Sequence, residues 1–292
     1  MNRYDCIIIG RGPAGLSAAL YCARAGLSTM VLARDDGALA KAAHVENYFA
    51  ADGAPSGSEL LSRARAQADR LKVEFTQDEV LAVEPDNGFT VVCTRNSYSA
   101  TAVIIATGAQ RRSALLKNAA AFEGKGLSYC AVCDAFFYRG KTVAVLGAGE
   151  YALHELSALL PLAAKCYLLT DGAPAPELPD GVECITLPVK ALKGDVLLSS
   201  IEFSDSSSIA ADGLFVALGV AGAGDLARKI GAETQGGSIV VDKACRCTVD
   251  GLFAAGDCTG GILQASVAVG EGATAAMSAI AYVKKLRSAQ NS

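Results

Sequence analysis

The stretch that decides the fold is YDCIIIGRGPAGLSAALYCARAG, residues 4–26. A short apolar run at 4–9 ends in the glycine-rich turn 10–15, and a segment of helical character follows and stops at Gly26. The next apolar run, STMVLA at 28–33, predicts a second strand. Strand, glycine turn, helix and strand in this order predict a βαβ unit, the setting in which a GxGxxG pattern indicates a dinucleotide site.

The glycine-rich turn has the chemistry of a phosphate cradle. Glycines let the backbone approach a pyrophosphate closely, and the helix N-terminus at 12–15 supplies N–H donors and a positive dipole. The alternative is a glycine turn that only packs the helix against the strand. The second strand ends in VLARDD, so Ala33 and Arg34 stand where an acid would bind a ribose. The sequence therefore leaves the adenosine contacts open.

The same pattern returns in the middle of the chain. Residues 142–146 are apolar, GAGEYA at 147–152 is a GxGxxA turn, a helical segment follows at 153–163, and CYLLT at 166–170 predicts a strand. Two dinucleotide-fold units predict two domains, and 292 residues with 51% apolar content are enough to fill both cores. The predicted fold class is α/β with two Rossmann-like dinucleotide-binding domains.

Further segments predict the elements between and after these units. ELLSRARAQADRLKV at 59–73 predicts an amphipathic helix, and VIIATGA at 103–109 predicts a buried strand that enters a glycine turn. GLFAAGDC at 251–258 predicts another strand, which leads into a Gly-Asp turn. A helix of small residues is expected from about Gln264 to Leu286.

Charge and hydropathy exclude several kinds of partner. The formal charge is −4, and no run of five or six like charges occurs, so nucleic acid has no electrostatic footprint. No stretch of eighteen apolar residues occurs, and the N-terminus lacks the layout of a signal peptide. We therefore expect a cytoplasmic protein that binds neither nucleic acid nor a membrane.

Ten cysteines are scattered through the chain, and only two clusters are closely spaced, at 130–133 (CAVC) and at 245–247 (CRC). A CxxC pair brings two sulfurs within reach of a disulfide, and a helix N-terminus or a nearby charge can lower the pKa of one thiol. Asp134, beside the pair, could move protons. Two core cysteines are the alternative interpretation.

Half of a zinc site is a further alternative for the CxxC pair. Zinc would need a second pair of ligands, and the two histidines, His44 and His154, lie far off in sequence. Cys245 and Cys247 could supply that pair, but we expect them in a strand, where alternate residues share a face. We expect no metal, and we expect all cysteines other than Cys130 and Cys133 to be dispensable for turnover.

At these residues the chain resembles the low-molecular-weight thioredoxin reductase family, over nearly its full length. The matching stretches are GRGPAG at 10–15, VEN at 45–47, IIATGA at 104–109, GLSYCAVCDAFFYRGK at 126–141 and GLFAAGD at 251–257. The stretch at 126–141 is very specific. The resemblance implies a discontinuous FAD domain made of residues 1–112 and 240–292, and an inserted NAD(P)H-like domain, 113–239, that carries the dithiol.

The resemblance also implies FAD as cofactor and a role for each matched residue. The residues implied to hold the FAD pyrophosphate are Gly10, Gly12, Pro13, Ala14 and Gly15. Asn47 and Thr107 would line the flavin, Asp257 would bind the ribitol, and Gln264 with Ala265 would meet the pyrimidine end of the ring. Gly108 and Gly256 complete the implied cofactor-binding set.

For the dithiol, the resemblance implies that Cys133 lies against the flavin C4a, that Cys130 attacks the substrate disulfide, and that Asp134 acts as acid and base. CxxC geometry also leads us to expect the first sulfur to be the more exposed.

Departures from the family are concentrated in the second domain. Tyr151 replaces a small hydroxyl residue beside the pyrophosphate, and His154 replaces an acid. After the second strand, LTDG at 169–172 offers no positive charge where the family has a His-Arg-Arg cluster for the NADPH 2'-phosphate. Prolines at 174, 176 and 179 predict a loop in place of a further helix. This pattern resembles the ferredoxin-dependent flavin thioredoxin reductases, a branch that uses no pyridine nucleotide.

We therefore expect an enzyme that reduces a thioredoxin-like disulfide with ferredoxin as electron donor, and we expect a homodimer. Asp171 stands close to where an acid selecting NADH would be expected, so reduction by NADH or NADPH stays open. A flavin dithiol oxidase and a non-catalytic FAD-binding interaction module are further alternatives. The residues suggested for docking an acidic ferredoxin are Arg111, Arg112, Lys117 and Lys125.

Overall fold

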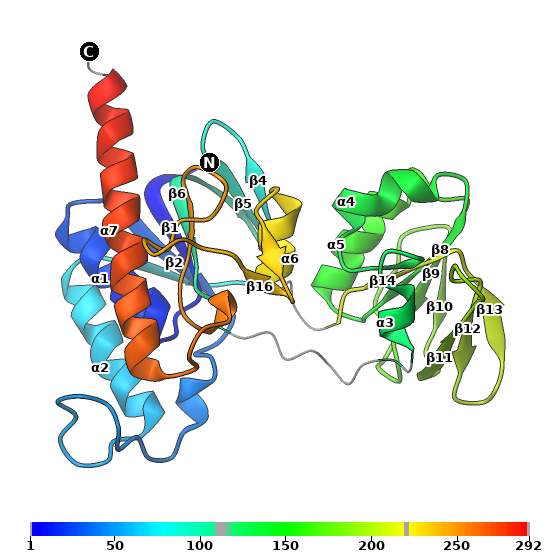
Figure 1. The fold of residues 1–292 in the computed structure, drawn as a ribbon, viewed down its shortest axis with the longest axis horizontal. Coiled ribbons are helices and arrows are strands. Elements are labelled where there is room, and N and C mark those ends of the chain that lie inside the picture. The colour runs from blue at the N-terminus through cyan, green and yellow to red at the C-terminus, as the bar shows by residue number, and fades with distance from the viewer. Residues whose placement is uncertain (1, 109–115, 117, 219–221, 291–292) are drawn as a thin grey trace. The chain divides into compact units, whose positions relative to one another are not determined.

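The computed structural model describes residues 2–108, 116, 118–218 and 222–290. The chain divides into two compact units: unit 1 comprises Met1–Gln110 and Gly222–Ser292, and unit 2 comprises Arg111–Ala221 (Figure 1). Unit 1 is thus built from both ends of the chain, and unit 2 is inserted into it.

Unit 1 contains a seven-stranded sheet in the order β3-β2-β1-β6-β5-β4, with β17 pairing to β6. Its strands are β1 (Arg3–Ile9), β2 (Thr29–Ala33), β3 (Glu74–Gln77), β4 (Val80–Pro85), β5 (Phe89–Cys93), β6 (Ser97–Ile105) and β17 (Leu252–Ala254). Strands β3, β2, β1, β6 and β17 run parallel to one another, whereas β5 is antiparallel to both β6 and β4. The first half of β6 pairs with the antiparallel strand β5, and its second half pairs with the parallel strand β17.

Helices and short elements complete unit 1. They are α1 (Pro13–Arg24), η1 (Leu39–Lys41), α2 (Gly57–Arg70), α6 (Ala223–Lys229), η3 (Asp257–Thr259) and α7 (Ala265–Gln290), with a small hairpin of β15 (Thr234–Gln235) and β16 (Ser238–Ile239). Helices α1 and α7 pack against each other through small residues. A Cβ at Gly272 of α7 would lie 2.1 Å from the Ala14 carbonyl oxygen, so glycine there permits the close approach.

The chain re-enters unit 1 at Gly222, earlier than the residue 240 expected from the sequence. The reason is that α6 packs against β4, and Lys229 Nζ of α6 lies 3.5 Å from the Leu81 carbonyl oxygen, which accepts its hydrogen bond. Residues 222–239 therefore belong with the first unit.

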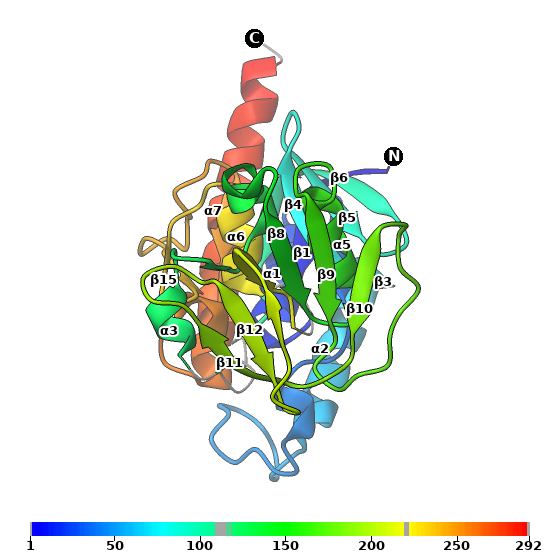
Figure 2. The ribbon, with the colours of Figure 1, turned by 90° about the vertical axis from the view of Figure 1, so that its right-hand side faces the viewer.

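Unit 2 contains a five-stranded parallel sheet in the order β10-β9-β8-β14-β7. These strands are β7 (Leu127–Ser128), β8 (Thr142–Leu146), β9 (Lys165–Leu169), β10 (Val182–Ile185) and β14 (Gly213–Val216). An antiparallel sheet of β11 (Val189–Lys193), β12 (Ser200–Phe203) and β13 (Ser208–Ala210) accompanies it, and Figure 2 shows β8, β9 and β10 side by side in unit 2. The helices are α3 (Ala119–Phe122), α4 (Ala131–Asp134), η2 (Ala135–Tyr138) and α5 (Glu150–Leu159).

Both predicted βαβ units are confirmed, as β1-α1-β2 in unit 1 and β8-α5-β9 in unit 2. The α/β class with two Rossmann-like units is therefore confirmed. Residues 170–181, all of which the structure describes, contain no helix, as the prolines of this segment predict.

The strand expected around Cys245 and Cys247 is wrong. Cys245 has φ +58°, and only Arg246 forms an isolated bridge, to Phe253. The Asp242 carboxylate accepts the N–H groups of Ala244 (2.8 Å) and Arg246 (2.9 Å) and closes a turn, which replaces strand pairing.

Helix α7 is long and apolar enough to cross a membrane by length and composition, the one such helix in the described part of the chain. Its buried residues, among them Ala275, Ala276, Ala279 and Val283, belong to the core of unit 1. The packing against α1 accounts for its apolar composition, so a membrane span is only weakly indicated.

Candidate active site

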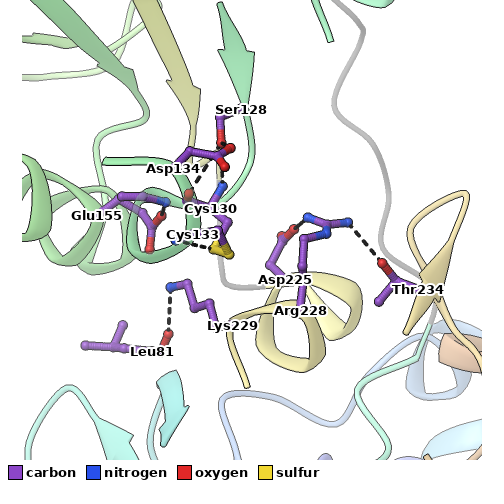
Figure 3. Close-up of a disulfide and its surroundings, with 11 residues drawn as sticks. Leu81, Ser128, Cys130, Cys133, Asp134, Glu155, Asp225, Arg228, Lys229 and Thr234 are labelled. Carbon is purple, nitrogen blue, oxygen red and sulfur yellow. Dashed lines mark hydrogen bonds and ion pairs between the residues drawn. A yellow bond between two sulfur atoms is a disulfide. The ribbon is translucent and has the colours of Figure 1, made fainter. Parts of the chain in front are cut away.

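Cys130 and Cys133 form a disulfide, with Cα atoms 5.4 Å apart, at the start of α4 (Figure 3). Cys130 is the N-cap of this short helix, and its Sγ accepts a hydrogen bond from the Cys133 N–H at 3.2 Å. The pair predicted from the CxxC spacing to form a disulfide is thus confirmed as one.

The two cysteines differ in exposure, in the opposite sense to the expectation. Cys130 is 2% exposed, whereas Cys133 is exposed. Cys130 lies two residues after the buried strand β7 and its neighbour Ala131 is fully buried, whereas Cys133 lies one turn later. The CxxC spacing alone does not reveal which sulfur is more exposed, because the exposure depends on which end of the turn is attached to a buried element.

Asp134 is linked to the first cysteine through Ser128. The Ser128 hydroxyl donates to Asp134 Oδ2 at 2.7 Å and accepts from the Cys130 N–H at 3.1 Å (Figure 3). The predicted acid therefore stands on the same turn as both sulfurs, in a hydrogen-bonded chain that ends at Cys130. Ser128 was not among the predicted site residues, and its position two residues before the pair carries no recognisable signal.

Glu155 of α5 was also missed. Its side chain is 1% exposed, and Oε2 accepts the Ala131 N–H at 2.6 Å, directly under the disulfide turn (Figure 3). A signal was present in the sequence: Glu155 occupies the same helical face as Ala152, Leu156 and Leu159, which are all buried. A carboxyl group on the apolar face of a predicted helix needs a partner.

Two large apolar rings stand beside the dithiol. Phe136 and Phe137 of η2 are 69% and 68% exposed, and their rings meet edge to face with centroids 6.3 Å apart. The Arg139 guanidinium lies 5.5 Å from the centroid of the Phe136 ring. Exposed aromatic rings together with an arginine are typical of a protein-docking surface.

In the glycine turn of unit 1, two glycines are required by close packing, and a third has open space at its Cβ position. A Cβ at Gly10 (φ +112°) would lie 2.2 Å from the Ala106 carbonyl oxygen, and one at Gly15 would lie 1.9 Å from the Gly10 oxygen. Gly12, in contrast, has φ −73° and nothing within 4 Å of its Cβ position. Packing within the protein therefore does not require glycine at position 12. A ligand that approaches the backbone closely would require it.

The start of α1 fits an anionic ligand. Gly12 is the N-cap and makes no side-chain cap, and Pro13 is the first helical residue, so the N–H groups of the first turn have no partner within the helix. Pro13, Ala14 and Gly15 lie in this first turn. The arrangement suits an anionic group such as the pyrophosphate that the resemblance implies here.

The other predicted flavin residues gather at one edge of the sheet. Strands β1, β6 and β17 are parallel, so Gly10, Thr107 with Gly108, and Gly256 with Asp257 all follow carboxyl ends at the same edge. Burial raises the pKa of Asp257.

Two predicted residues far apart in sequence, Asn47 and Gln264, are in contact. Asn47 Nδ2 donates to Gln264 Oε1 at 3.1 Å, and Ala265 opens α7 directly after Gln264. This hydrogen bond thus joins the loop after η1 to the residue before α7.

The adenosine side is bounded by charged groups. Arg34 pairs with Asp35 at 3.0 Å, and Arg11 pairs with Asp36 at 2.7 Å. Beside the glycine turn lies a cavity of about 200 Å³. Its lining residues are Arg11, Leu16, Asp36, Ser58, Leu61, Ser62 and Arg65. Asp36, the acidic side chain in this lining, pairs with Arg11 of the glycine turn.

The glycine turn of unit 2 differs from the first. Gly147 has φ +152°, and a Cβ there would lie 2.2 Å from the Ala217 carbonyl oxygen, so packing alone requires this glycine. Glu150 places a carboxyl group in the first turn of α5, where it would repel a pyrophosphate. Tyr151, also in the first turn of α5, is 1% exposed, so its large side chain is packed inside the protein.

Asp171, the candidate for NADH selection, already has a structural role. It adopts φ +51°, and Oδ1 accepts the Val189 N–H at 2.8 Å. The turn after β9 is closed further by Gly172 N–H, which donates to the Thr186 oxygen at 2.8 Å. One oxygen of the carboxylate is therefore occupied within the protein.

The remaining cysteines lack the features of a second redox or metal centre. Burial raises the pKa of Cys245 to about 11 and that of Cys247 to about 12, so both thiols are protonated at neutral pH. Among the residues that the structure describes, no three His, Cys, Asp or Glu side chains lie close enough together to hold a metal ion.

An inserted Rossmann-like unit with a CxxC disulfide, joined to a glycine-turn unit, defines a two-domain disulfide oxidoreductase. The model of the pyridine nucleotide-disulphide oxidoreductase family matches residues 4–174 and 179–272. The thioredoxin reductase of Aquifex aeolicus is 34% identical over 295 residues, covering 94% of this chain and 91% of the relative.

Solved structures agree with this assignment. An atypical thioredoxin reductase, TRi, from Desulfovibrio vulgaris Hildenborough is 40% identical with a TM-score of 0.91, over 96% of this chain and 98% of that one. A ferredoxin-flavin thioredoxin reductase from Clostridium acetobutylicum is 32% identical with a TM-score of 0.72, over 99% of both chains. The chain belongs to the pyridine nucleotide-disulphide oxidoreductase family and, within it, to the low-molecular-weight thioredoxin reductases.

Proposed function

We propose that this protein is an FAD-dependent thioredoxin reductase that passes electrons to the Cys130–Cys133 disulfide and from there to a thioredoxin-like protein. The observation that carries the proposal is the disulfide itself, hydrogen-bonded through Ser128 to Asp134. The exposed rings of Phe136 and Phe137 support a protein substrate, because they lie next to the reacting sulfurs in the chain.

FAD, when bound, supplies a carrier that takes up electrons one or two at a time. The residues that would hold it are the glycine turn 10–15, Asn47, Thr107, Gly108, Gly256, Asp257, Gln264 and Ala265. The open position at Gly12 and the Asn47–Gln264 contact support this set.

In the proposed reaction, Cys133 lies against the flavin and Cys130 attacks the substrate disulfide, while Asp134 moves the proton. The exposure of Cys133 in the oxidised protein supports its role as the sulfur that meets the flavin. Cys130, which is buried here, would become accessible only in another state of the enzyme. A homodimer and a cytoplasmic location belong to the same proposal.

We further propose that the electron donor is a reduced ferredoxin and not a pyridine nucleotide. Glu150 and Tyr151 stand at the turn where a nucleotide pyrophosphate would bind, and no basic side chain follows β9 to pair with a 2'-phosphate. Asp171 already accepts the Val189 N–H in its own turn, which argues against a role in binding the ribose of NADH. The similarity to a ferredoxin-flavin thioredoxin reductase points in the same direction.

A one-electron protein donor needs a docking surface near the flavin and no internal nucleotide pocket. Of the basic residues suggested for docking, Lys125 is exposed, and Arg111, Arg112 and Lys117 lie outside the described residues.

The test is anaerobic flavin bleaching of the purified yellow protein with NADPH, NADH and reduced ferredoxin side by side. We expect bleaching only by ferredoxin, slowed by added salt because charge guides the encounter. Bleaching by micromolar NADH or NADPH would refute the choice of donor but leave the disulfide reductase intact. A protein that takes up no FAD would refute the whole proposal, and peroxide release on adding a dithiol would indicate an oxidase instead.

A further inference from the structure

The dithiol turn is held on both sides of Cys130 by acidic side chains. The Cys130 N–H donates to Ser128 Oγ, which donates to Asp134, and the next N–H along the chain, that of Ala131, donates to Glu155 Oε2 at 2.6 Å. Glu155 comes from α5, which packs against α4, so it reaches the turn from a different element of the same unit.

The Glu155 carboxyl group and the Cys130 sulfur each accept a backbone N–H group of the dithiol turn. The sulfur accepts the Cys133 N–H and the carboxyl group accepts the Ala131 N–H, and both N–H groups belong to the one turn of α4. A carboxylate near a thiol disfavours the thiolate, because two like charges in a buried setting repel each other. It also takes up an N–H group that could otherwise stabilise a thiolate.

Other titratable groups around α4 are placed differently. Asp134 is on α4 itself and bonds Ser128, and Tyr138 lies on η2 with its ring 5.2 Å from the centroid of Phe215. On α5, Glu150 is exposed and His154 is half-buried. Glu155 is thus the almost fully buried acidic group that contacts the backbone next to Cys130.

We propose that Glu155 is a positioning residue of the dithiol, which orients the turn through Ala131 and keeps the proton on Cys130 after reduction. Reduction breaks the sulfur–sulfur bond with two electrons and one proton, leaving Cys130 as thiol and Cys133 as thiolate. The thiolate then lies on the sulfur assigned to the flavin, and Cys130 loses its proton through Asp134 only when it attacks the substrate. This inference rests on the proposed function, which supplies the electrons and the roles of the two sulfurs.

The experiment measures the proton affinity of Cys130 directly. In the Cys133→Ser protein, reduced with a chemical reductant, the rate of iodoacetamide labelling at Cys130 is followed by peptide mass spectrometry across a range of pH. Adding Glu155→Gln keeps the shape of the side chain and removes the charge. We expect the labelling profile to move to lower pH by about one unit or more.

The matched control is Glu150→Gln, which removes the same charge from the exposed start of the same helix and leaves the profile unchanged. Glu155→Asp, whose carboxylate is one methylene further from Ala131, gives a smaller decrease in the same direction. If Glu155→Gln does not fold, the labelling profile is measured in Glu155→Asp instead.

An unmoved profile in folded Glu155→Gln, whatever its thermal stability, would show that Glu155 only packs α5 against α4 and would overturn the inference. Because labelling needs neither FAD reduction nor a donor, failure of the proposed function appears separately, as wild-type protein whose reduced flavin does not reduce the disulfide.

Discussion

The glycine turns of the two units start alike and then diverge. The first glycine of each, Gly10 and Gly147, has a positive φ, and a Cβ on either would lie 2.2 Å from the carbonyl oxygen that follows a neighbouring strand. Both glycines are therefore required by packing. The difference lies in the residues after the N-cap glycine: Gly12 of unit 1 is followed by Pro13, whereas Gly149 of unit 2 is followed by Glu150 and the buried Tyr151.

The comparison shows that a glycine of such a turn can be required by packing alone, as Gly10 and Gly147 both are. A glycine whose Cβ position overlaps a neighbouring backbone atom is required by packing, whereas the open Cβ position of Gly12 leaves the backbone accessible to a ligand. The second unit retains the fold and carries the dithiol, and the first retains the features of a cofactor site.

The largest expected effect concerns the dithiol of unit 2. Cys130→Ser and Cys133→Ser should each lower thioredoxin reduction by about a thousandfold or more, because neither can form the disulfide. Only Cys130→Ser should show a thiolate-to-flavin charge-transfer band in its absorption spectrum. The band in Cys133→Ser and not in Cys130→Ser would reverse the assigned roles.

The packing role of the second turn predicts a loss of stability in Gly147→Ala. Its φ of +152° and the contact with the Ala217 oxygen should lower the free energy of unfolding by about 3 kcal/mol. Urea unfolding measures this, with the FAD content of the folded protein unchanged. A variant as stable as wild type would mean that this glycine is kept for a ligand after all.

The ligand role of the first turn predicts the opposite behaviour for Gly12→Ala. The added methyl group meets no protein atom, so the stability of the apoprotein should not change, but FAD affinity should fall by about tenfold or more. Fluorescence titration of apoprotein with FAD checks this, and urea unfolding of the apoprotein is the control. Unchanged affinity would contradict the assignment of the pyrophosphate to this position.

The smallest effect is expected at Asp171. Asp171→Ala removes the acceptor of the Val189 N–H and should lower the free energy of unfolding by about 1 kcal/mol, while Asp171→Asn retains an acceptor and costs less. Flavin reduction by ferredoxin should be unchanged in both. If wild type is reduced by NADH and Asp171→Ala is not, the carboxylate selects a nucleotide.

The local patterns were sufficient for much of the fold and part of the site. Apolar runs ending in glycine turns predicted β1-α1-β2 and β8-α5-β9, and the CxxC spacing predicted the disulfide. These features depend on residues close together in the chain, whose periodicity and turn chemistry are visible in the sequence. The family resemblance, rather than local pattern, suggested the contact partners Asn47 and Gln264.

What the sequence by itself determined is therefore the two Rossmann-like units, the dithiol and the residues matched to a cofactor. Only the tertiary structure decided that the chain re-enters unit 1 at Gly222, that Cys130 is the buried sulfur, and that Glu155 bonds the dithiol turn. It also separated Gly147, required by packing, from Gly12, which is open. The physical reason is that each of these depends on which distant backbone atoms come within contact distance, and neither composition nor spacing along the chain records such contacts.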